Sequence, residues 1–223
     1  MRKWIGMIVL VSMTALAAVG CTDDKQTTEP ATEPATEAVS PEQETEAAST
    51  EAAKPDKSAD AVTVVIDVKD YGKITVDLDA ESAPITVENF VKLVKEGFYD
   101  GLTFHRIMEG FMMQGGDPTG TGSGGSEETI TGEFEANGIK NPISHARGTI
   151  SMARSQDPDS ASSQFFIVQK DSFFLDGQYA AFGKVTEGMD VVDKICEDAE
   201  PTDDNGTIPP ENQPVINSIT IKE

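Results

Sequence analysis

The chain has 223 residues, 12 prolines and a formal net charge of −22, from 39 acidic against 17 basic side chains. This length suffices for one domain with a sizeable core, or for one domain with a tail. So large an excess of negative charge argues against binding to nucleic acid and against direct contact with anionic lipid.

The N-terminal stretch predicts export. Two basic residues precede an apolar run from Trp4 to Val19, which is short for a membrane-spanning helix but typical of the core of a signal peptide. The run ends in A-V-G-C, which resembles the lipobox where a bacterial lipoprotein is cut and acylated on its cysteine, although Ala18 stands where leucine is usual. We expect residues 1–20 to be a lipoprotein-type signal peptide and Cys21 to carry lipid, which anchors the protein to the bacterial cell membrane outside the cytoplasm. The alternative is an uncleaved N-terminal anchor.

The next stretch predicts a solvated tether. Residues 22–60 carry eleven Asp and Glu against three Lys, and they repeat the sequence A-T-E-P-A-T-E-A. Such a composition cannot bury enough apolar surface to offset its conformational entropy. Four prolines interrupt every candidate helix, at Pro30, Pro34, Pro41 and Pro55. We therefore expect residues 21–60 to be an acidic disordered tether that begins with the lipidated cysteine, and residues 61–223 to be the folded domain.

The folded domain opens with signals for a hairpin and a helix. The β-rich residues Val62 to Val68 and the alternating residues Lys73 to Leu78 flank the turn signal Asp70-Tyr71-Gly72, a pattern typical of two antiparallel strands. Pro84 suits the first turn of a helix, which Gly97 ends. Apolar side chains recur on one face of this helix, at Val87, Phe90, Val91 and Val94.

The rest of the domain is rich in short apolar runs. They predict strands at Leu102 to Ile107, Phe111 to Gln114, Thr149 to Ala153, Gln164 to Val168 and Ala180 to Val185. A second helix is expected from about Met189 to Ile195, with Cys196 packed near its end. An acidic loop from Glu197 to Gln213 leads to a last strand, Val215 to Ile221. Many short strands with only two helices indicate a mainly β antiparallel barrel or sandwich.

One segment, F-H-R-I-M-E-G-F-M-M-Q-G-G-D from Phe104 to Asp117, sets an arginine and a glutamine among apolar side chains. Arg106 cannot give up its proton, so it offers fixed hydrogen-bond donors and no proton to transfer. Gln114 can hold that guanidinium in place. Composition alone leaves two interpretations open: a site that binds a carbonyl or a lone pair, or a buried strand whose arginine reaches a structural carboxylate.

The segment resembles the signature of the cyclophilins, a family of prolyl isomerases. Four further blocks resemble the family in the same order and at similar spacing, so the resemblance covers most of residues 62 to 221. They are Gly148 to Ala153, Ser163 to Ile167, Phe174 to Gly177 and Phe182 to Val185. The resemblance implies an all-β (mainly β) fold, a closed eight-stranded antiparallel barrel capped by two α-helices.

The resemblance also implies a site. Arg106 would be the catalytic donor to the proline nitrogen, with Gln114 as its positioner and as a contact to the substrate backbone. The proline pocket would consist of Phe111, Met112, Phe166 and Leu175. Other expected substrate-binding residues are Ala153, Arg154 and Ser155, which match a segment that binds the residues before the proline, together with Gln164, Phe174 and Tyr179.

Three of these positions depart from the common pattern. Arg154 stands where the family has a familiar asparagine, which implies an altered substrate preference. Phe174 stands where many eukaryotic members have tryptophan, and Tyr179 where they have histidine. Because the tryptophan donates a hydrogen bond to the inhibitor cyclosporin, we expect weak cyclosporin binding here.

The chemistry of such a site is simple. An X-Pro bond loses its amide resonance when it rotates, against a barrier of roughly 20 kcal/mol. A catalyst therefore needs no nucleophile, metal or cofactor, only a site that binds the twisted amide better than either planar form. An apolar pocket for the proline ring and a fixed donor to its nitrogen would provide that.

Three other patterns are weak. Residues 120–125 satisfy G-x-G-x-x-G, but no helix follows and Ser126-Glu127-Glu128 would repel a pyrophosphate, so we expect a flexible loop beside the cleft. A calcium loop around Gly206 fails at its first and last ligand positions. His105 and His145 lack a second ligand at metal spacing and are interpreted as structural, with His105 pointing away from Arg106.

The sequence therefore predicts a monomeric peptidyl-prolyl isomerase that acts on proline-containing, exported polypeptides and assists their folding at the cell surface. Two alternatives remain open. One is a non-catalytic, proline-recognising chaperone or adaptor with the same pocket. The other is a purely structural surface barrel, which would leave Arg106 and Gln114 without a role.

Overall fold

The computed structural model describes residues 62–222. The expected signal peptide, Cys21 and the acidic tether lie outside the described residues. The described part begins with the predicted hairpin, in which β1 (Val62–Val68) pairs with β2 (Gly72–Leu78). Its turn contains Asp70 at φ 65, a left-handed conformation that aspartate tolerates better than most residues.

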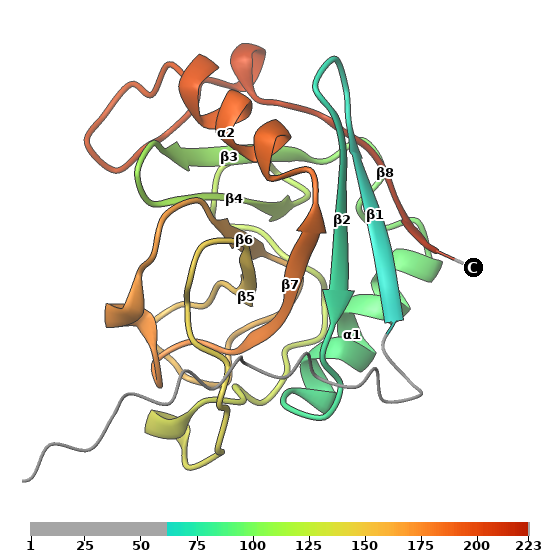
Figure 1. The fold of residues 1–223 in the computed structure, drawn as a ribbon, viewed down its shortest axis with the longest axis vertical. Helices are drawn as coiled ribbons and strands as arrows, with labels where there is room; N and C mark the ends of the chain where they lie inside the picture. The colour runs from blue at the N-terminus through green and yellow to red at the C-terminus, as the bar shows by residue number, and fades with distance from the viewer. Residues whose placement is uncertain (1–61, 223) are drawn as a thin grey trace, which may run out of the picture. The chain divides into compact units, whose positions relative to one another are not determined.

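Eight strands form one curled antiparallel sheet in the order β3-β4-β6-β5-β7-β2-β1-β8 (Figure 1). The remaining strands are β3 (Thr103–Met108), β4 (Met112–Asp117), β5 (Thr149–Met152), β6 (Phe165–Val168), β7 (Ala181–Glu187) and β8 (Ile216–Ile221). All the predicted strands are present. The largest difference is in β4, which continues through Gly115, Gly116 and Asp117, where no apolar run marks it.

The expected closed barrel is only partly confirmed. Strands β3 and β8 are the two ends of the sheet order, and no ladder joins them within residues 62–222. They approach through a single bridge between Thr103 and Val215 and through neighbouring main-chain hydrogen bonds, such as that from Ile216 N to Leu102 O at 2.8 Å. The sheet is therefore curled and open. Its two end strands are held near each other by contacts between residues 101–104 and residues 214–216.

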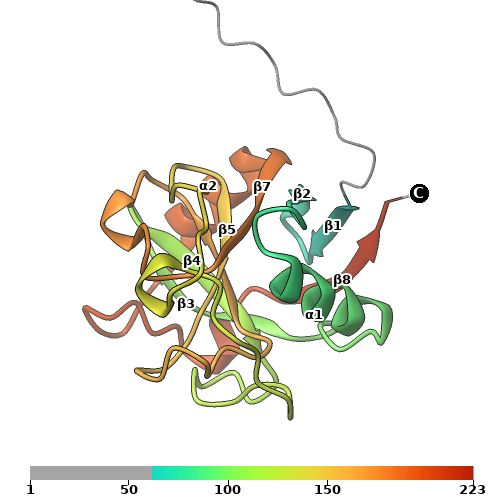
Figure 2. The ribbon, with the colours of Figure 1, turned by 90° about the horizontal axis from the view of Figure 1, so that it is seen from below.

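The two predicted helices are confirmed. α1 (Pro84–Lys95) lies beside β8, in the lower part of Figure 1, whereas α2 (Met189–Asp198) packs against β2 and β4, in its upper part (Figures 1 and 2). Three short 3-10 turns, 135–137, 173–175 and 210–212, add to the predicted elements. No helix of the described residues is both long and apolar enough to cross a membrane.

The N-terminus of α1 has an unexpected cap. Its N-cap residue, Ala83, offers no side-chain oxygen. The buried carboxylate of Glu133 accepts hydrogen bonds instead from Ile85 N at 3.0 Å, Thr86 N at 2.8 Å and Thr86 Oγ1 at 2.6 Å. Free N–H groups at a helix start favour a negative charge, so this distant residue fixes the helix to the loop before β5.

The apolar side chains form two clusters on opposite faces of the sheet. Successive residues of a strand point to opposite faces, and β6 shows this directly. Phe165 and Ile167 belong to the main core with both helices, while Phe166 and Val168 belong to a smaller cluster with Met112 and Leu175. The smaller cluster lies outside the main core and forms the floor of a pocket.

Candidate active site

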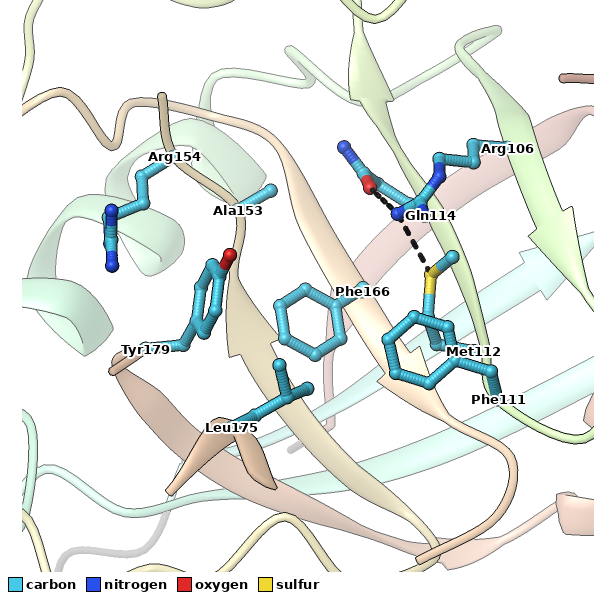
Figure 3. Close-up of a pocket in the computed structure, with 9 residues that line it drawn as sticks. All are labelled: Arg106, Phe111, Met112, Gln114, Ala153, Arg154, Phe166, Leu175 and Tyr179. Atoms are coloured by element: carbon cyan, nitrogen blue, oxygen red, sulfur yellow. Dashed lines mark hydrogen bonds between the residues drawn. The ribbon is translucent and has the colours of Figure 1, made fainter. Parts of the chain in front are cut away.

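A pocket of about 130 Å³ lies over the smaller apolar cluster. An engineered cavity of roughly 150 Å³ holds benzene, so the space suits a small ring. Nine residues line it: Arg106, Phe111, Met112, Gln114, Ala153, Arg154, Phe166, Leu175 and Tyr179 (Figure 3). All nine were predicted as site residues, and the structure brings them together from β3, the turn between β3 and β4, β4, β6 and the segments beyond β5 and before β7.

The centre of the pocket is apolar. Phe166 lies in the middle of the close-up, with Met112 and Phe111 to its right, Leu175 below it and Tyr179 to its left (Figure 3). The Tyr179 ring meets Phe166 edge-on, with ring centroids 5.9 Å apart. This arrangement gives a proline ring a floor and walls of carbon atoms, and it leaves the polar groups to the rim.

Arg106 and Gln114 face each other across the β3–β4 ladder, where they are a register pair. Arg106 Nη1 donates to Gln114 Oε1 at 3.2 Å. The register shifts between Phe104 and Arg106. Such a bulge re-aims side chains. It lets Phe104 enter the main core while Arg106, two residues later, lines the pocket on the opposite face.

The amide of Gln114 is itself held by a second glutamine. Gln114 Nε2 donates to Gln164 Oε1 at 2.9 Å. Gln164 Nε2 donates in turn to the main-chain oxygens of Gly122 at 3.1 Å and Gly124 at 2.7 Å. These bonds fix which end of each amide faces Arg106, because every donor meets an acceptor. The sequence predicted Gln164 as a substrate-binding residue, but it does not line the pocket. Its contact in the structure is with Gln114, which it holds in place.

A second support of Arg106 comes from the acidic loop before β8. Arg106 Nε donates to the main-chain oxygen of Asn205 at 2.7 Å, and Nη2 lies 3.3 Å from Met108 Sδ. Partial burial lowers the pKa of Arg106 from its ordinary value, and the nearby carboxylate of Asp203 opposes this effect. The guanidinium nevertheless stays charged at neutral pH.

The turn that carries Asn205 is tightly hydrogen-bonded. The Asp203 carboxylate accepts from Asn205 N at 3.0 Å, Thr207 N at 3.0 Å and Thr207 Oγ1 at 2.9 Å. Ile107 N donates to Gly206 O at 2.8 Å, which docks the turn on β3. Gly206 has φ +85, and a side chain there would collide with Ile107 O, so glycine is required. Sequence reasoning missed this contact to Arg106, because it uses a main-chain oxygen.

Arg154 is held on the side of Phe166 away from Arg106 (Figure 3). Its Nε and Nη2 donate to Gln178 O at 3.1 and 2.7 Å, and Nη1 donates to Ser155 O at 2.9 Å. Its guanidinium carbon lies 4.7 Å from the Tyr179 ring centroid and 4.9 Å from that of Phe134. Stacking and three hydrogen bonds keep this charge in one place at the pocket wall.

Two other predicted residues lie outside the pocket. Phe174 is 71% exposed and contacts the rim through Phe111, with ring centroids 5.6 Å apart. Ser155 is exposed, and its hydroxyl is bonded to Ser160 Oγ at 2.8 Å. The resemblance implied that both bind substrate, but neither lines the pocket in the structure.

His145 was expected to be structural, and its contacts agree. Its ring stacks on Phe166 with centroids 6.0 Å apart. Nδ1 lies 2.9 Å from Asp176 Oδ1 and Nε2 lies 3.0 Å from Ser151 Oγ. Burial lowers the pKa of His145, against the opposing effect of Asp176. The three residues have the order of a catalytic triad, but Ser151 is fully buried, so they serve to hold the pocket floor.

The glycine-rich loop is more firmly held than the expected flexible loop. The Asp117 carboxylate accepts from the main-chain N–H groups of Thr119, Thr121, Gly122 and Gly124 at 2.6 to 3.1 Å. Burial by itself raises the pKa of Asp117, but these hydrogen bonds outweigh it and lower the value to about 2. The loop carries the carbonyls that hold Gln164, so Asp117 belongs to the support of the site.

His105 does not line the pocket. It is 4% exposed, and neither ring nitrogen has a hydrogen-bond partner among the described residues. Burial lowers its pKa, with Asp117 opposing and Arg106 reinforcing the effect. Residues 62–222 contain no group of three or more His, Cys, Asp or Glu side chains placed to hold a metal ion.

Comparison with known proteins identifies the family that shares these features. Residues 63–222 match the family described as "Cyclophilin type peptidyl-prolyl cis-trans isomerase/CLD". The chain is 50% identical over 123 residues to peptidyl-prolyl cis-trans isomerase B of Bacillus subtilis, a match that covers 55% of this chain and 82% of the relative. It is 45% identical over 145 residues to peptidyl-prolyl cis-trans isomerase A of Dickeya dadantii, covering 63% and 74%.

A solved structure agrees. A cyclophilin-type peptidyl-prolyl cis-trans isomerase from Cryptosporidium parvum, crystallised in the presence of the dipeptide Ala-Pro, superimposes with a TM-score of 0.64 at 31% identity. The match covers 72% of this chain and 99% of that one. The fold and the sequence comparisons thus point to the same family.

Proposed function

Because this chain belongs to the cyclophilin-type peptidyl-prolyl cis-trans isomerases, we propose that the pocket over Phe166 is where it accelerates rotation about X-Pro bonds in exported or cell-surface proteins. The isomerase activity follows from the family. The site residues, the substrates and the location are our proposal.

The proposed reaction needs binding and one donor. The proline ring lies on Phe166, between Met112, Phe111 and Leu175, and water is displaced from the amide. As the C–N bond twists, the nitrogen regains a lone pair, and Arg106 donates a hydrogen bond to it. In a site shielded from water, such a fixed donor stabilises the twisted form more than either planar form. No bond to carbon forms or breaks.

One observation carries the proposal: the Arg106 guanidinium is fixed by Gln114 and by the Asn205 carbonyl at the edge of an apolar pocket of proline size. Both contacts leave part of the guanidinium free, since an arginine has five N–H donors. The Ala-Pro dipeptide named for the Cryptosporidium relative supports proline-containing peptides as substrates. We propose that Ala153, Arg154 and Ser155 bind the residues before the proline.

A cis-trans exchange assay on a short Ala-Pro peptide tests the function. The full chain should accelerate exchange, and Arg106→Ala should lower kcat/KM at least tenfold, or about 1.4 kcal/mol of transition-state stabilisation, while the circular dichroism spectrum stays native. EDTA should change nothing. Binding of the peptide without any acceleration would favour the alternative, a proline-recognising chaperone or adaptor.

The proposed location needs a separate test, because residues 1–61 lie outside the described structure. We propose that Cys21 is lipidated and that the domain acts outside the cytoplasm on exported clients. Cys21→Ser should accumulate as a larger, unprocessed precursor, and the wild-type protein should fractionate with membranes. Normal cleavage and release of Cys21→Ser would identify an ordinary signal peptide instead.

A further inference from the structure

The side chain of Arg154 joins two segments of the pocket wall. Ser155 belongs to the segment after β5, and Gln178 to the segment before β7. Past the main-chain bond from Met152 N to Ala180 O at 3.0 Å, no main-chain hydrogen bond joins these segments within residues 62–222. Arg154 bridges them instead, because its guanidinium donates to Gln178 O at 3.1 and 2.7 Å and to Ser155 O at 2.9 Å. One arginine therefore joins the two segments beyond the sheet.

The same guanidinium fixes the ring of Tyr179. Its central carbon lies 4.7 Å from the ring centroid of Tyr179 and 4.9 Å from that of Phe134, which is buried in the main core. The Tyr179 ring also meets Phe166 edge-on, with ring centroids 5.9 Å apart. Arg154 holds the carbonyl of Gln178 as well, the residue directly before the tyrosine. Both the ring and the main chain of Tyr179 are therefore held in place.

Tyr179 carries a donor that the described part of the protein does not use. Its side chain lines the pocket, and its hydroxyl forms no hydrogen bond within residues 62–222. In the close-up the hydroxyl points away from Leu175 and towards Ala153, on the side of Phe166 opposite Arg106 (Figure 3). A tyrosine hydroxyl in a partly apolar site usually has a hydrogen-bond partner, and here a ligand can supply it. The pocket thus has a second fixed donor, across its floor from the first.

The position of this donor selects a group of the substrate. In the proposed function the proline ring lies on Phe166 and the residues before it follow Ala153 to Ser155, so the Tyr179 hydroxyl faces that part of the substrate. The first carbonyl on that side belongs to the rotating amide, and its oxygen is most negative when the amide is planar. A donor to it would stabilise the planar forms and slow rotation. The next carbonyl, that of the second residue before the proline, keeps its charge throughout.

We propose that the Tyr179 hydroxyl donates a hydrogen bond to the carbonyl oxygen of the second residue before the proline, and that Arg154 is the positioning residue that fixes the Tyr179 ring for this contact. The inference rests on the proposed function. Rotation turns one side of the X-Pro bond against the other, and this contact holds the preceding residues while the pocket holds the proline ring. Because the contact lies outside the rotating amide, it stabilises the planar and twisted forms equally. Such uniform binding lowers KM and leaves kcat unchanged.

The experiment compares two peptides as substrates of the full chain, held in detergent micelles. Acetyl-Ala-Pro-Phe-amide carries the carbonyl in question in its acetyl group, whereas Ala-Pro-Phe-amide with a free amino terminus lacks it. Cis-trans exchange of each peptide, followed by NMR over a range of peptide concentrations, gives kcat and KM. Tyr179→Phe should raise KM for the acetylated peptide about two- to tenfold with kcat unchanged, the effect of losing one hydrogen bond. For the free-amine peptide it should leave both constants as in wild type.

Further variants test the positioning by Arg154 and control for the loss of a hydroxyl. Arg154→Lys keeps the charge but not the planar fork that binds Gln178 O and Ser155 O, so it should raise KM for the acetylated peptide by up to the same factor. Combined with Tyr179→Phe it should cause no further loss, because both changes act on the same hydrogen bond. Tyr71→Phe removes a hydroxyl outside the pocket and should match wild type with both peptides.

The possible results are distinct. Equal losses in Tyr179→Phe for the two peptides would overturn the hydrogen bond, since the free-amine peptide has no carbonyl at that place. A loss in kcat would place the donor on the rotating amide and overturn the proposed contact as well. Additive losses in the double variant would overturn Arg154 as the positioning residue. An active wild type with an unaffected Tyr179→Phe would overturn only this inference, whereas a wild type that accelerates neither peptide would reject the proposed function with it.

Discussion

The main-chain oxygen of Asn205 accepts a 2.7 Å hydrogen bond from Nε of Arg106, a residue 99 positions earlier in the chain. Gln114 holds the other side of the same guanidinium through Nη1. Two contacts on different nitrogens fix the plane of the group, which a single contact would leave free to rotate. The acidic loop before β8 therefore takes part in orienting the proposed catalytic residue.

Asp203→Ala should weaken catalysis without removing the catalytic group. The carboxylate of Asp203 organises the turn that presents the Asn205 oxygen, and losing one hydrogen bond of this kind costs roughly 0.5 to 1.5 kcal/mol. We expect kcat/KM to fall about two- to tenfold, mostly through kcat, in a peptide exchange assay. Asp203→Asn, which keeps one acceptor oxygen, should recover part of the loss.

Asp204→Ala is the matched control, since its side chain is exposed and forms no hydrogen bond within residues 62–222. It should behave as wild type. Equal losses in the two variants would mean that the loop acts through its net charge and not through the turn. A loss in Asp203→Ala that appears only as a higher KM would mean that the loop contacts substrate.

Asp117→Asn should destabilise the domain. The pKa of Asp117 is lowered to about 2 from an ordinary 3.8, which corresponds to roughly 2 kcal/mol of stability. Because the folded value is the lower one, this stability is present above pH 4 and is lost as pH falls towards 2. Urea unfolding at pH 7 should show a loss of about 2 kcal/mol, and the variant should have a shallower pH dependence between 4 and 2.

The same variant tests the support behind the site. The Asp117 loop carries the carbonyls of Gly122 and Gly124, which hold Gln164 and through it Gln114. If Asp117→Asn still folds, we therefore expect a lower kcat/KM. We also expect the side-chain amide signal of Gln114 to shift in NMR spectra. Unchanged stability together with unchanged turnover would show that the loop is held by its other contacts.

Hydrophobic patterning predicted the elements of this fold well. A β-rich run marked β1, alternation marked β2 and β8, and an i, i+3, i+4 face marked α1, because these elements each bury one side against the main core. β4 was predicted too short, since its last residues are Gly115, Gly116 and Asp117. Those positions pair as a strand only because β3 and β6 flank them.

Contacts made between distant segments were not predictable from the sequence. Nothing near Ala83 signals that Glu133 caps α1, and no residue type marks Asn205 as a main-chain partner of Arg106. The nine pocket residues were found because the family resemblance supplied them. The resemblance also led us to expect a closed barrel. Whether β3 and β8 join depends on contacts between distant segments, such as the bridge between Thr103 and Val215, which the sequence does not reveal.

His105→Leu should change the response of stability to acid. Both ring nitrogens of His105 lack partners among the described residues, and burial holds its pKa below the ordinary value near 6.5. The unfolded chain therefore binds the proton first, so stability is present above pH 6.5 and is lost as pH falls below it. We expect His105→Leu to match wild type within about 1 kcal/mol at pH 7.5 and to lose less stability by pH 5.5.

His145→Leu provides the contrast, because His145 is bonded to Asp176 and Ser151. Removing it leaves two polar groups without their partner, at a cost of roughly 1 to 3 kcal/mol at pH 7.5. Denaturant titrations of the three proteins at both pH values measure these differences. Parallel curves for wild type and His105→Leu would show that His105 keeps its ordinary pKa in the folded state.

The last prediction concerns cyclosporin, which in many family members accepts a hydrogen bond from a tryptophan indole at the position of Phe174. Phe174 cannot donate, although its ring packs on Phe111 at the pocket rim. The residue is 71% exposed to solvent, so a ligand can contact it. A carbonyl of the inhibitor would lose its partner in a partly dry site, at roughly 1 to 3 kcal/mol, or about five- to 150-fold in affinity.

We therefore expect weak inhibition of the wild type with nearly normal peptide turnover, because the proposed donor to the substrate nitrogen is Arg106 and the proline pocket does not include Phe174. Phe174→Trp should recover much of the affinity, since the indole adds the missing donor and keeps the apolar contact to Phe111. Titration of both proteins with cyclosporin, followed by isomerase activity, gives the comparison. Wild type inhibited as tightly as Phe174→Trp would mean that the indole donor is irrelevant here, or that Phe174 does not occupy the tryptophan position.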